Sequence, residues 1–219
     1  MRSLSALTIS MMKINSIAAQ PDRVGRHAVR FEDGSVMRLF RQTVEDFCLY
    51  TGKELTEEEM GKLKEAAGAM SAKMRAVRIL SVSGVSKKDL EHRLIQKGEA
   101  PNHAKKAVEW MEEMDLVDDR KTASHVVERC IAKGYGLARA KQALYEKRIP
   151  KEYWQEALED YPDQTEHIVA FLESRLTDAH DYKQFRKVMD ALIRRGHSYG
   201  TIRRALDQLS VDTDQFPED

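Results

Sequence analysis

The sequence predicts a mainly α-helical protein, built as tandem three-helix repeats in an elongated curved array, with a small N-terminal β-hairpin. Three observations lead to this fold class. Apolar residues recur every three or four positions over most of the chain, which is the period of an amphipathic helix. Residues 76–108 align without a gap on residues 126–158, and part of the pattern returns a third time before residue 206. Alternating apolar runs are confined to residues 12–40.

The composition limits the classes of partner and compartment. Lysine plus arginine and aspartate plus glutamate both number 36, so the formal net charge is zero and any contact with a polyanion must come from a local basic face. Cys48 and Cys130 lie far apart and form no C-x-x-C pair, which favours a reducing cytoplasm over a disulfide framework or a zinc site. No run approaches the ~20 apolar residues that a membrane span requires.

The N-terminal region, residues 1–63, is expected to hold the hairpin and short helices. Asp33-Gly34 is a strong turn signal between two apolar runs, and no strand is expected after residue 40. Arg2 followed by Leu4 to Met12 faintly resembles a secretory signal, with Ala18-Ala19 as a small-residue cleavage site. Because the apolar run is short and Lys13 interrupts the approach to that site, we expect instead that translation starts at Met11 or Met12 and that residues 1–10 are a dispensable tail.

Two helices are predicted between the hairpin and the repeats. The first covers residues 44–50, and Gly52 ends it. The second opens at a capping box, in which Thr56 supplies the cap hydroxyl and Glu59 the reciprocal carboxylate. This second helix either continues through Gly68 or breaks there.

The repeats are expected at residues 64–115, 116–161 and 162–219. In each copy a glycine closes the first helix, a basic second helix follows, and the third helix begins near a proline, as at Pro101. In the last copy residues 188–206 align on residues 126–144, which predicts a weak or absent final helix and a frayed acidic tail. Single units bury little apolar surface, so the copies are expected to stack.

The ordered repeat motifs resemble the RecX family of regulatory proteins. The likeness covers residues 72–206 and rests on three stretches: Ala76 to Leu80 with Ser86 to Leu90 and Lys97-Gly98; Leu116 to Asp119 with Lys133 to Gly136; and Leu192 to Tyr199 with Ile202 and Leu206. Three departures stand out. Lys147-Arg148 occupies a position where many members have Lys-Gly, Ser81-Val-Ser83 stands where members often carry arginine, and the chain is neutral where many relatives are basic.

The resemblance implies a non-catalytic regulator that binds RecA and its DNA filament. Such proteins limit strand exchange, ATP hydrolysis and filament growth during homologous recombination, DNA repair and the SOS response. The implied partners are the RecA filament and, weakly and without sequence preference, DNA; no membrane contact is expected, and the protein is expected to be a monomer. A curved array can touch several RecA subunits at once, so weak contacts add through effective concentration.

Basic side chains in the later repeats are the candidate contacts with the filament or with DNA. They alternate with apolar core positions at helical spacing, which predicts that they project outward. The alternative is that they are an ordinary solvated face. The set is Arg139, Lys141, Lys147, Arg148, Arg194, Arg195, Arg203 and Arg204.

Parts of the sequence also fit functions other than the regulation of RecA. A glycine turn before a basic helix also suits a direct DNA-binding protein with helix-turn-helix-like modules, and the third possibility is a scaffold for some other protein. Trp110 and Trp154 are expected in the core, and Asp118 as a helix cap. No metal-ligand spacing, nucleotide loop or nucleophile motif is found, so no catalytic residue, cofactor or metal is expected.

Overall fold

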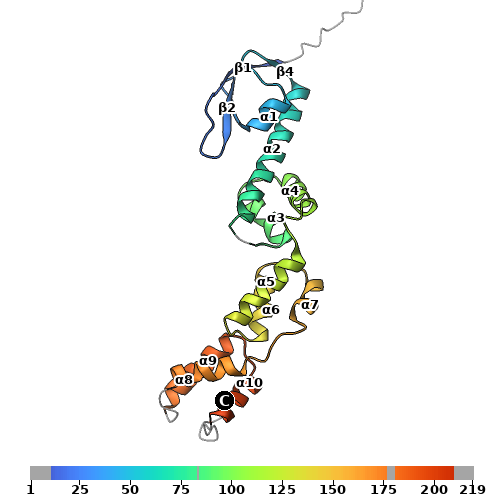
Figure 1. The fold of residues 1–219 in the computed structure, drawn as a ribbon. Coiled ribbons are helices and arrows are strands. Elements are labelled where there is room, and N and C mark those ends of the chain that lie inside the picture. The colour runs from blue at the N-terminus through green and yellow to red at the C-terminus, as the bar shows by residue number, and fades with distance from the viewer. Residues whose placement is uncertain (1–10, 83, 177–180, 210–219) are drawn as a thin grey trace, which may run out of the picture. The chain divides into compact units, whose positions relative to one another are not determined.

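The computed structural model describes residues 11–82, 84–176 and 181–209 of the chain (Figure 1). They form two compact units: residues 11–82 with 90–116, and residues 84–89 with 117–176 and 181–209. The predicted class is confirmed, because the described residues are mainly α-helical and carry a small N-terminal antiparallel sheet. The expectations for residues 1–10 and for the acidic tail fall outside the described residues.

Unit 1 begins with a four-stranded antiparallel sheet rather than a lone hairpin. Strands β1 (Met11–Ile17), β2 (Arg26–Phe31), β3 (Val36–Phe40) and β4 (Glu54–Thr56) lie in the order β3-β2-β1-β4. The predicted turn at Asp33-Gly34 is confirmed: Gly34 has a φ of 81°, and the Asp33 carboxylate accepts from the Ser35 amide at 2.8 Å. The expectation of no further strand was wrong, because β4 pairs with β1.

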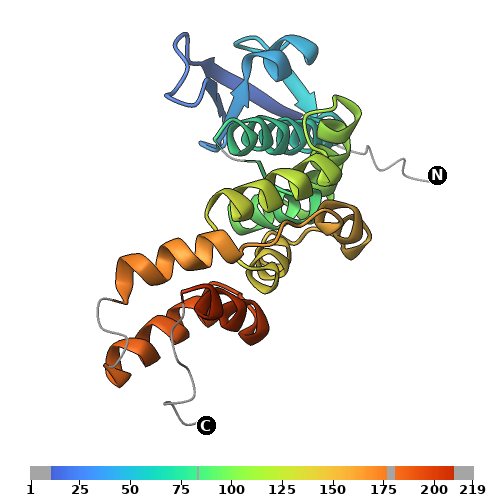
Figure 2. The same cartoon turned by 60° about the horizontal axis from the view of Figure 1, so that its bottom comes forward.

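Three helices and part of a fourth complete this unit. They are α1 (Arg41–Asp46), α2 (Glu57–Leu80), α3 (Lys87–Gln96) and α4 (Pro101–Glu113), and the division between units passes through α3. Both halves of the capping box form at Thr56 and Glu59. Helix α2 runs along one face of the sheet (Figure 2), and the core beneath it contains Ile14, Val29, Phe31, Leu39, Leu49, Leu55 and Leu63.

Helix α2 continues unbroken through Gly68, where His103 of α4 lies close against its backbone. A Cβ atom on Gly68 would lie 2.2 Å from Cε1 of His103, so only glycine leaves room for the imidazole. The His103 Nε2 lies 2.8 Å from a carboxylate oxygen of Glu65, one turn earlier on α2. This close approach ties α4 to α2 and closes the first three-helix group.

Unit 2 contains two further groups of helices. The first comprises α5 (Asp119–Ala132), α6 (Leu137–Glu146), a 3-10 turn (Lys151–Tyr153) and α7 (Trp154–Leu158). The second comprises α8 (Thr165–Arg175), α9 (Tyr182–Arg194) and α10 (Tyr199–Gln208). Each group has its own apolar cluster, around Val127 and Leu144 in the first and around Leu172 and Leu192 in the second.

The last group has three helices, and their order differs from the alignment made on sequence. Helix α10 packs chiefly against α8, in the way that α7 packs against α5 and α4 against α2. Helix α10 is therefore the final helix of its group, and α9 corresponds to the second helix. The alignment had matched α9 with α5 and had left the final helix weak or absent.

Candidate partner-binding surface

All eight candidate cations lie in unit 2, on α6, α9 and α10 and in the turns that follow α6 and α9. The structure separates them into two groups of four. Arg139, Arg148, Arg195 and Arg204 are engaged with other side chains of the unit. Lys141, Lys147, Arg194 and Arg203 have no such partner within the described residues.

Arg148 holds the start of α3 against the turn after α6. Its guanidinium donates to the carboxylate of Asp89 at 2.8 Å, and the Asp89 side chain is 5% exposed. Beside it, the Ser86 hydroxyl donates to the carbonyl of Lys147 at 2.6 Å and accepts from the Asp89 amide. A guanidinium that is paired with a nearly buried carboxylate contributes to the stability of the fold before it can contribute to binding a partner.

The start of α6 docks in the same manner against the turn after α9. The Gly136 amide donates to the carbonyl of Arg195 at 2.9 Å, and Nε2 of the buried His197 donates to the carbonyl of Gly134 at 3.0 Å. A Cβ atom on Gly136 would lie 2.0 Å from the carbonyl oxygen of Gly196. The two backbones touch, so neither helix can shift without breaking this junction.

The two junctions use equivalent turns. Gly98, Arg148 and Gly196, which follow α3, α6 and α9, all have a left-handed backbone, with φ of 90°, 53° and 85°. A left-handed residue after a helix lets the next amide return to the helix's last carbonyls. This shared geometry is compatible with a correspondence of α9 to α3 and α6, but Gly134 after α5 has a φ of 61° as well, so the packing of α10 on α8 decides the correspondence. The shared geometry also shows why Lys147-Arg148 is unusual, because a non-glycine residue occupies the left-handed position.

Arg195 lies between aromatic rings. Its guanidinium carbon is 4.4 Å from the centre of the Phe171 ring and 6.0 Å from that of Tyr135. The Tyr161 hydroxyl donates to the Tyr135 carbonyl at 2.6 Å, and burial raises the pKa of Tyr161 to about 12. Cation–π contacts of this kind fix the guanidinium in place, so Arg195 joins α9, α8 and the turn before α6.

The other two engaged arginines form ion pairs nearer the solvent. Arg139 lies 2.9 Å from Glu146, and the hydrogen bond between them raises the pKa of Arg139 and lowers that of Glu146. Arg204 lies 3.4 Å from Asp163, and both side chains are more than half exposed. Pairs this exposed contribute little to stability, so Arg204 stays available to a partner.

The unengaged cations include the ones that a partner can reach most easily. Lys141, Arg194 and Arg203 are exposed, and Lys147 is half-buried. Lys141 of α6 and Arg204 of α10 line one cleft of about 520 Å³. The structure therefore brings two of the eight candidates together, from helices far apart in the sequence.

A second hollow adjoins the same side of α6, and sequence reasoning did not identify it. It has a volume of about 580 Å³ and is lined by Leu137, Lys141, Lys151, Trp154 and Leu158, among others. Leu137 is 42% exposed, which is unusual for a leucine at the start of a helix that otherwise buries its apolar side. No signal in the sequence indicated this hollow, because Leu137 fits the helical spacing of the buried Ala140 and Leu144 and so is expected in the core.

Trp154, Trp110 and Asp118 make contacts within the fold. The Trp154 indole N–H donates to the Ile149 carbonyl at 3.0 Å, and the ring packs in the α5–α7 cluster as expected. Trp110 is half-buried, with the ammonium of Lys73 4.7 Å above its ring. Asp118 caps α5 as predicted, accepting from two backbone amides that lower its pKa.

No family model matches this chain, but its sequence is similar to those of several curated proteins. It is 26% identical over 203 residues to regulatory protein RecX of Clostridioides difficile, covering 90% of this chain and 94% of that protein. It is 23% identical over 193 residues to regulatory protein RecX of Streptococcus sanguinis, covering 86% and 75%. Regulatory protein RecX of Vibrio parahaemolyticus is 27% identical over 146 residues, covering 65% and 94%.

The chain is therefore similar to regulatory proteins named RecX along most of its length. Its fold agrees: a crystal structure of regulatory protein RecX superposes with a TM-score of 0.60 at 22% identity, covering 90% of this chain and 99% of that one. RecX from Lactobacillus salivarius gives a TM-score of 0.58 at 23% identity over 67% of this chain and 99% of that one. No helix in the described part of this chain is long and apolar enough to cross a membrane.

Proposed function

We propose that this RecX-like chain binds RecA and its DNA filament and restrains their recombinase and ATPase activities in the cytoplasm. The observation that carries the proposal is the set of exposed, unengaged cations on three helices of one unit: Lys141, Arg194 and Arg203, with Arg204 only weakly paired. Cations without internal partners can meet acidic protein surfaces or phosphates at no cost to the fold. The similarity to regulatory proteins named RecX supports the proposal.

The alternative, a sequence-reading helix-turn-helix, is disfavoured by the helix starts. A recognition helix presents its N-terminal residues to base edges in the major groove. Here the first amides of α6 are used internally, because Gly136 and Ala138 donate to the carbonyls of Arg195 and Gly196. At the start of α3 the Lys87 amide donates to the carboxylate of Asp119 at 2.8 Å. Both helix starts are thus closed by the neighbouring group.

RecA-dependent ATP hydrolysis on single-stranded DNA, with this protein titrated in, tests the proposal. Wild type should inhibit, and the double reversal Lys141→Glu with Arg203→Glu should raise the half-inhibitory concentration by roughly tenfold, equivalent to about 1.4 kcal/mol. The matched control is Lys183→Glu with Lys187→Glu, two exposed cations of α9 outside the candidate set. The control should stay close to wild type.

Two results would count against the proposal. Hydrolysis that is unchanged by an excess of wild-type protein would remove RecA as the target. Equal inhibition by wild type and the Lys141/Arg203 variant would keep the target and remove this surface. A much tighter complex with one duplex sequence than with others would instead favour the DNA reader, since mismatches then cost ~1–3 kcal/mol each.

A further inference from the structure

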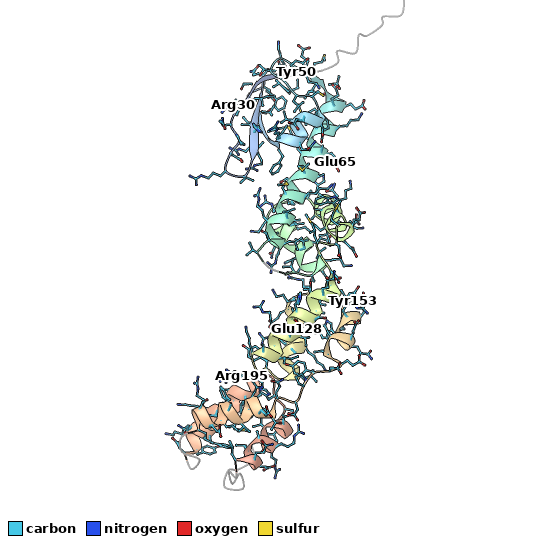
Figure 3. The ribbon with its side chains drawn as sticks, in the orientation of Figure 1. Arg30, Tyr50, Glu65, Glu128, Tyr153 and Arg195 are labelled. Atoms are coloured by element: carbon cyan, nitrogen blue, oxygen red, sulfur yellow. The ribbon has the colours of Figure 1, made fainter. Side chains whose placement is uncertain are left out.

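The sheet of unit 1 has one covered face and one bare face. In the ladder between β2 and β3, Ala28 is opposite Arg38 and Arg30 is opposite Val36. Side chains alternate along a strand, so Val29 points the other way, where it is fully buried in the core beneath α2. Arg30 and Arg38 therefore project from the face that the helices leave uncovered (Figure 3 marks Arg30).

These two arginines are neighbours and lack internal partners. They are diagonal on adjacent antiparallel strands, a relation that separates their positions by about 7–8 Å. Both are exposed, and so is Arg23 in the loop before β2. Within the described part of the chain none of the three has an ion pair or a side-chain hydrogen bond.

Two nearby arginines, in contrast, form ion pairs with carboxylates of the same unit. Arg26 lies 2.9 Å from Asp22, and Arg41 lies 2.6 Å from Glu45. Carboxylates therefore occur in this region and are placed to satisfy particular arginines. Arg30 and Arg38 are left without such a carboxylate.

Apolar groups lie between the arginines on the same face. Val36, opposite Arg30, is 49% exposed, and Ala28, opposite Arg38, is half-buried. The half-buried Phe40 follows two positions after Arg38 on β3. The bare face is thus a flat surface of small apolar patches crossed by two unpaired guanidiniums.

We propose that this face binds the backbone of a single-stranded nucleic acid. Arg38 lies on the edge strand β3 and Arg30 on the neighbouring strand β2, and the planar fork of donors of an arginine matches the oxygens of a phosphate. A single strand offers both complements: phosphates for the guanidiniums, and sugars and bases for Val36 and Phe40. The inference goes beyond the RecA proposal, because it concerns unit 1 and requires no protein partner.

Fluorescence anisotropy of a labelled oligothymidylate with the full chain tests the inference at low and moderate salt. Arg30→Glu with Arg38→Glu should weaken binding at least about tenfold and lower the slope of log affinity on log salt by about 1.4, since each lost phosphate contact removes about 0.7. Arg30→Lys with Arg38→Lys should retain most of the binding. The matched control is Lys62→Glu with Lys105→Glu, exposed cations on α2 and α4 of the same unit.

Each outcome decides the inference separately from the RecA proposal. Lost oligonucleotide binding with unchanged inhibition of RecA on a saturating DNA template supports it, whatever becomes of the unit 2 surface. Unchanged affinity and salt slope in the Arg30/Arg38 variant overturn it, as does no binding by wild type at low salt. Tighter, Arg30-dependent binding to a duplex overturns the single-stranded assignment. Lost RecA inhibition with intact oligonucleotide binding would make this face a protein surface and overturn the inference.

Discussion

Arg148 combines an unfavourable backbone with a favourable side-chain contact. Its φ of 53° costs a non-glycine residue roughly 1–2 kcal/mol, while its guanidinium neutralises the nearly buried Asp89. Arg148→Ala should therefore lower the free energy of unfolding by about 1–3 kcal/mol, because the carboxylate loses a charged donor and the strain remains. Arg148→Gly should be about 1 kcal/mol more stable than the alanine variant, because the strain is relieved.

Urea denaturation of the full chain measures both variants, with Arg203→Ala as an exposed control expected within about 0.5 kcal/mol of wild type. An alanine variant as stable as wild type would show that the Asp89 contact contributes nothing. The glycine variant would then exceed wild type, as expected if only backbone strain mattered.

His197 makes the junction between α6 and the turn after α9 sensitive to pH. Burial lowers its pKa, and the nearby Arg195 and His167 lower it further, while the Gly134 carbonyl raises it. Above the unfolded pKa of about 6.5, both states hold a neutral imidazole and stability is complete. As pH falls below that value the unfolded chain takes up a proton that the folded chain resists, so stability is lost.

The free energy of unfolding should therefore decline more steeply between about pH 7 and pH 5 in wild type than in His197→Gln, by at most about 1.4 kcal/mol per pH unit. Glutamine keeps an N–H donor for the Gly134 carbonyl and does not titrate. Equal slopes in the two proteins would mean that His197 is protonated as readily in the folded chain as in the unfolded one.

At the scale of elements, local sequence signals predicted a structure correctly where the conformation of a segment depends only on its own residues. The capping box at Thr56 and the turn at Asp33-Gly34 formed as predicted. Strand β4 was missed because three residues cannot display a period and its existence depends on pairing with β1. The order of the last three helices was misread because a left-handed glycine closes first helices, as at Gly134, and second helices, as at Gly196. Only the packing of α10 on α8 separates these cases.

The candidate site had the same limit. Helical spacing predicted that the eight cations project outward but could not say which of them already had partners. The partner of Arg148 is 59 residues away along the chain, so no local pattern could reveal it. The arginines of the sheet escaped notice for a different reason: their face depends on the β2–β3 register, which fixes Arg30 and Arg38 on the uncovered side.

At the scale of the whole molecule, the two proposed surfaces lie on separate units and carry separate charges. If both engage one RecA–DNA filament, each binding event raises the effective concentration of the other surface. Variants in the two surfaces share no side-chain partner, so their free-energy costs should add. The filament affinity of a protein carrying Arg30→Glu, Arg38→Glu, Lys141→Glu and Arg203→Glu should then fall by about the product of the two separate losses.

Binding to RecA–DNA filaments and to bare oligothymidylate, measured with all three variants under the same salt, separates this arrangement from a single shared site. On the filament both surfaces should matter. On the bare oligonucleotide the Arg30/Arg38 reversal should account for most of the loss, because the unit 2 cations are proposed to meet RecA as well as phosphate. The protein with all four substitutions could instead bind filaments no more weakly than the weaker-binding of the two double variants. That result would mean that one surface alone engages the filament and that avidity plays no part in regulation.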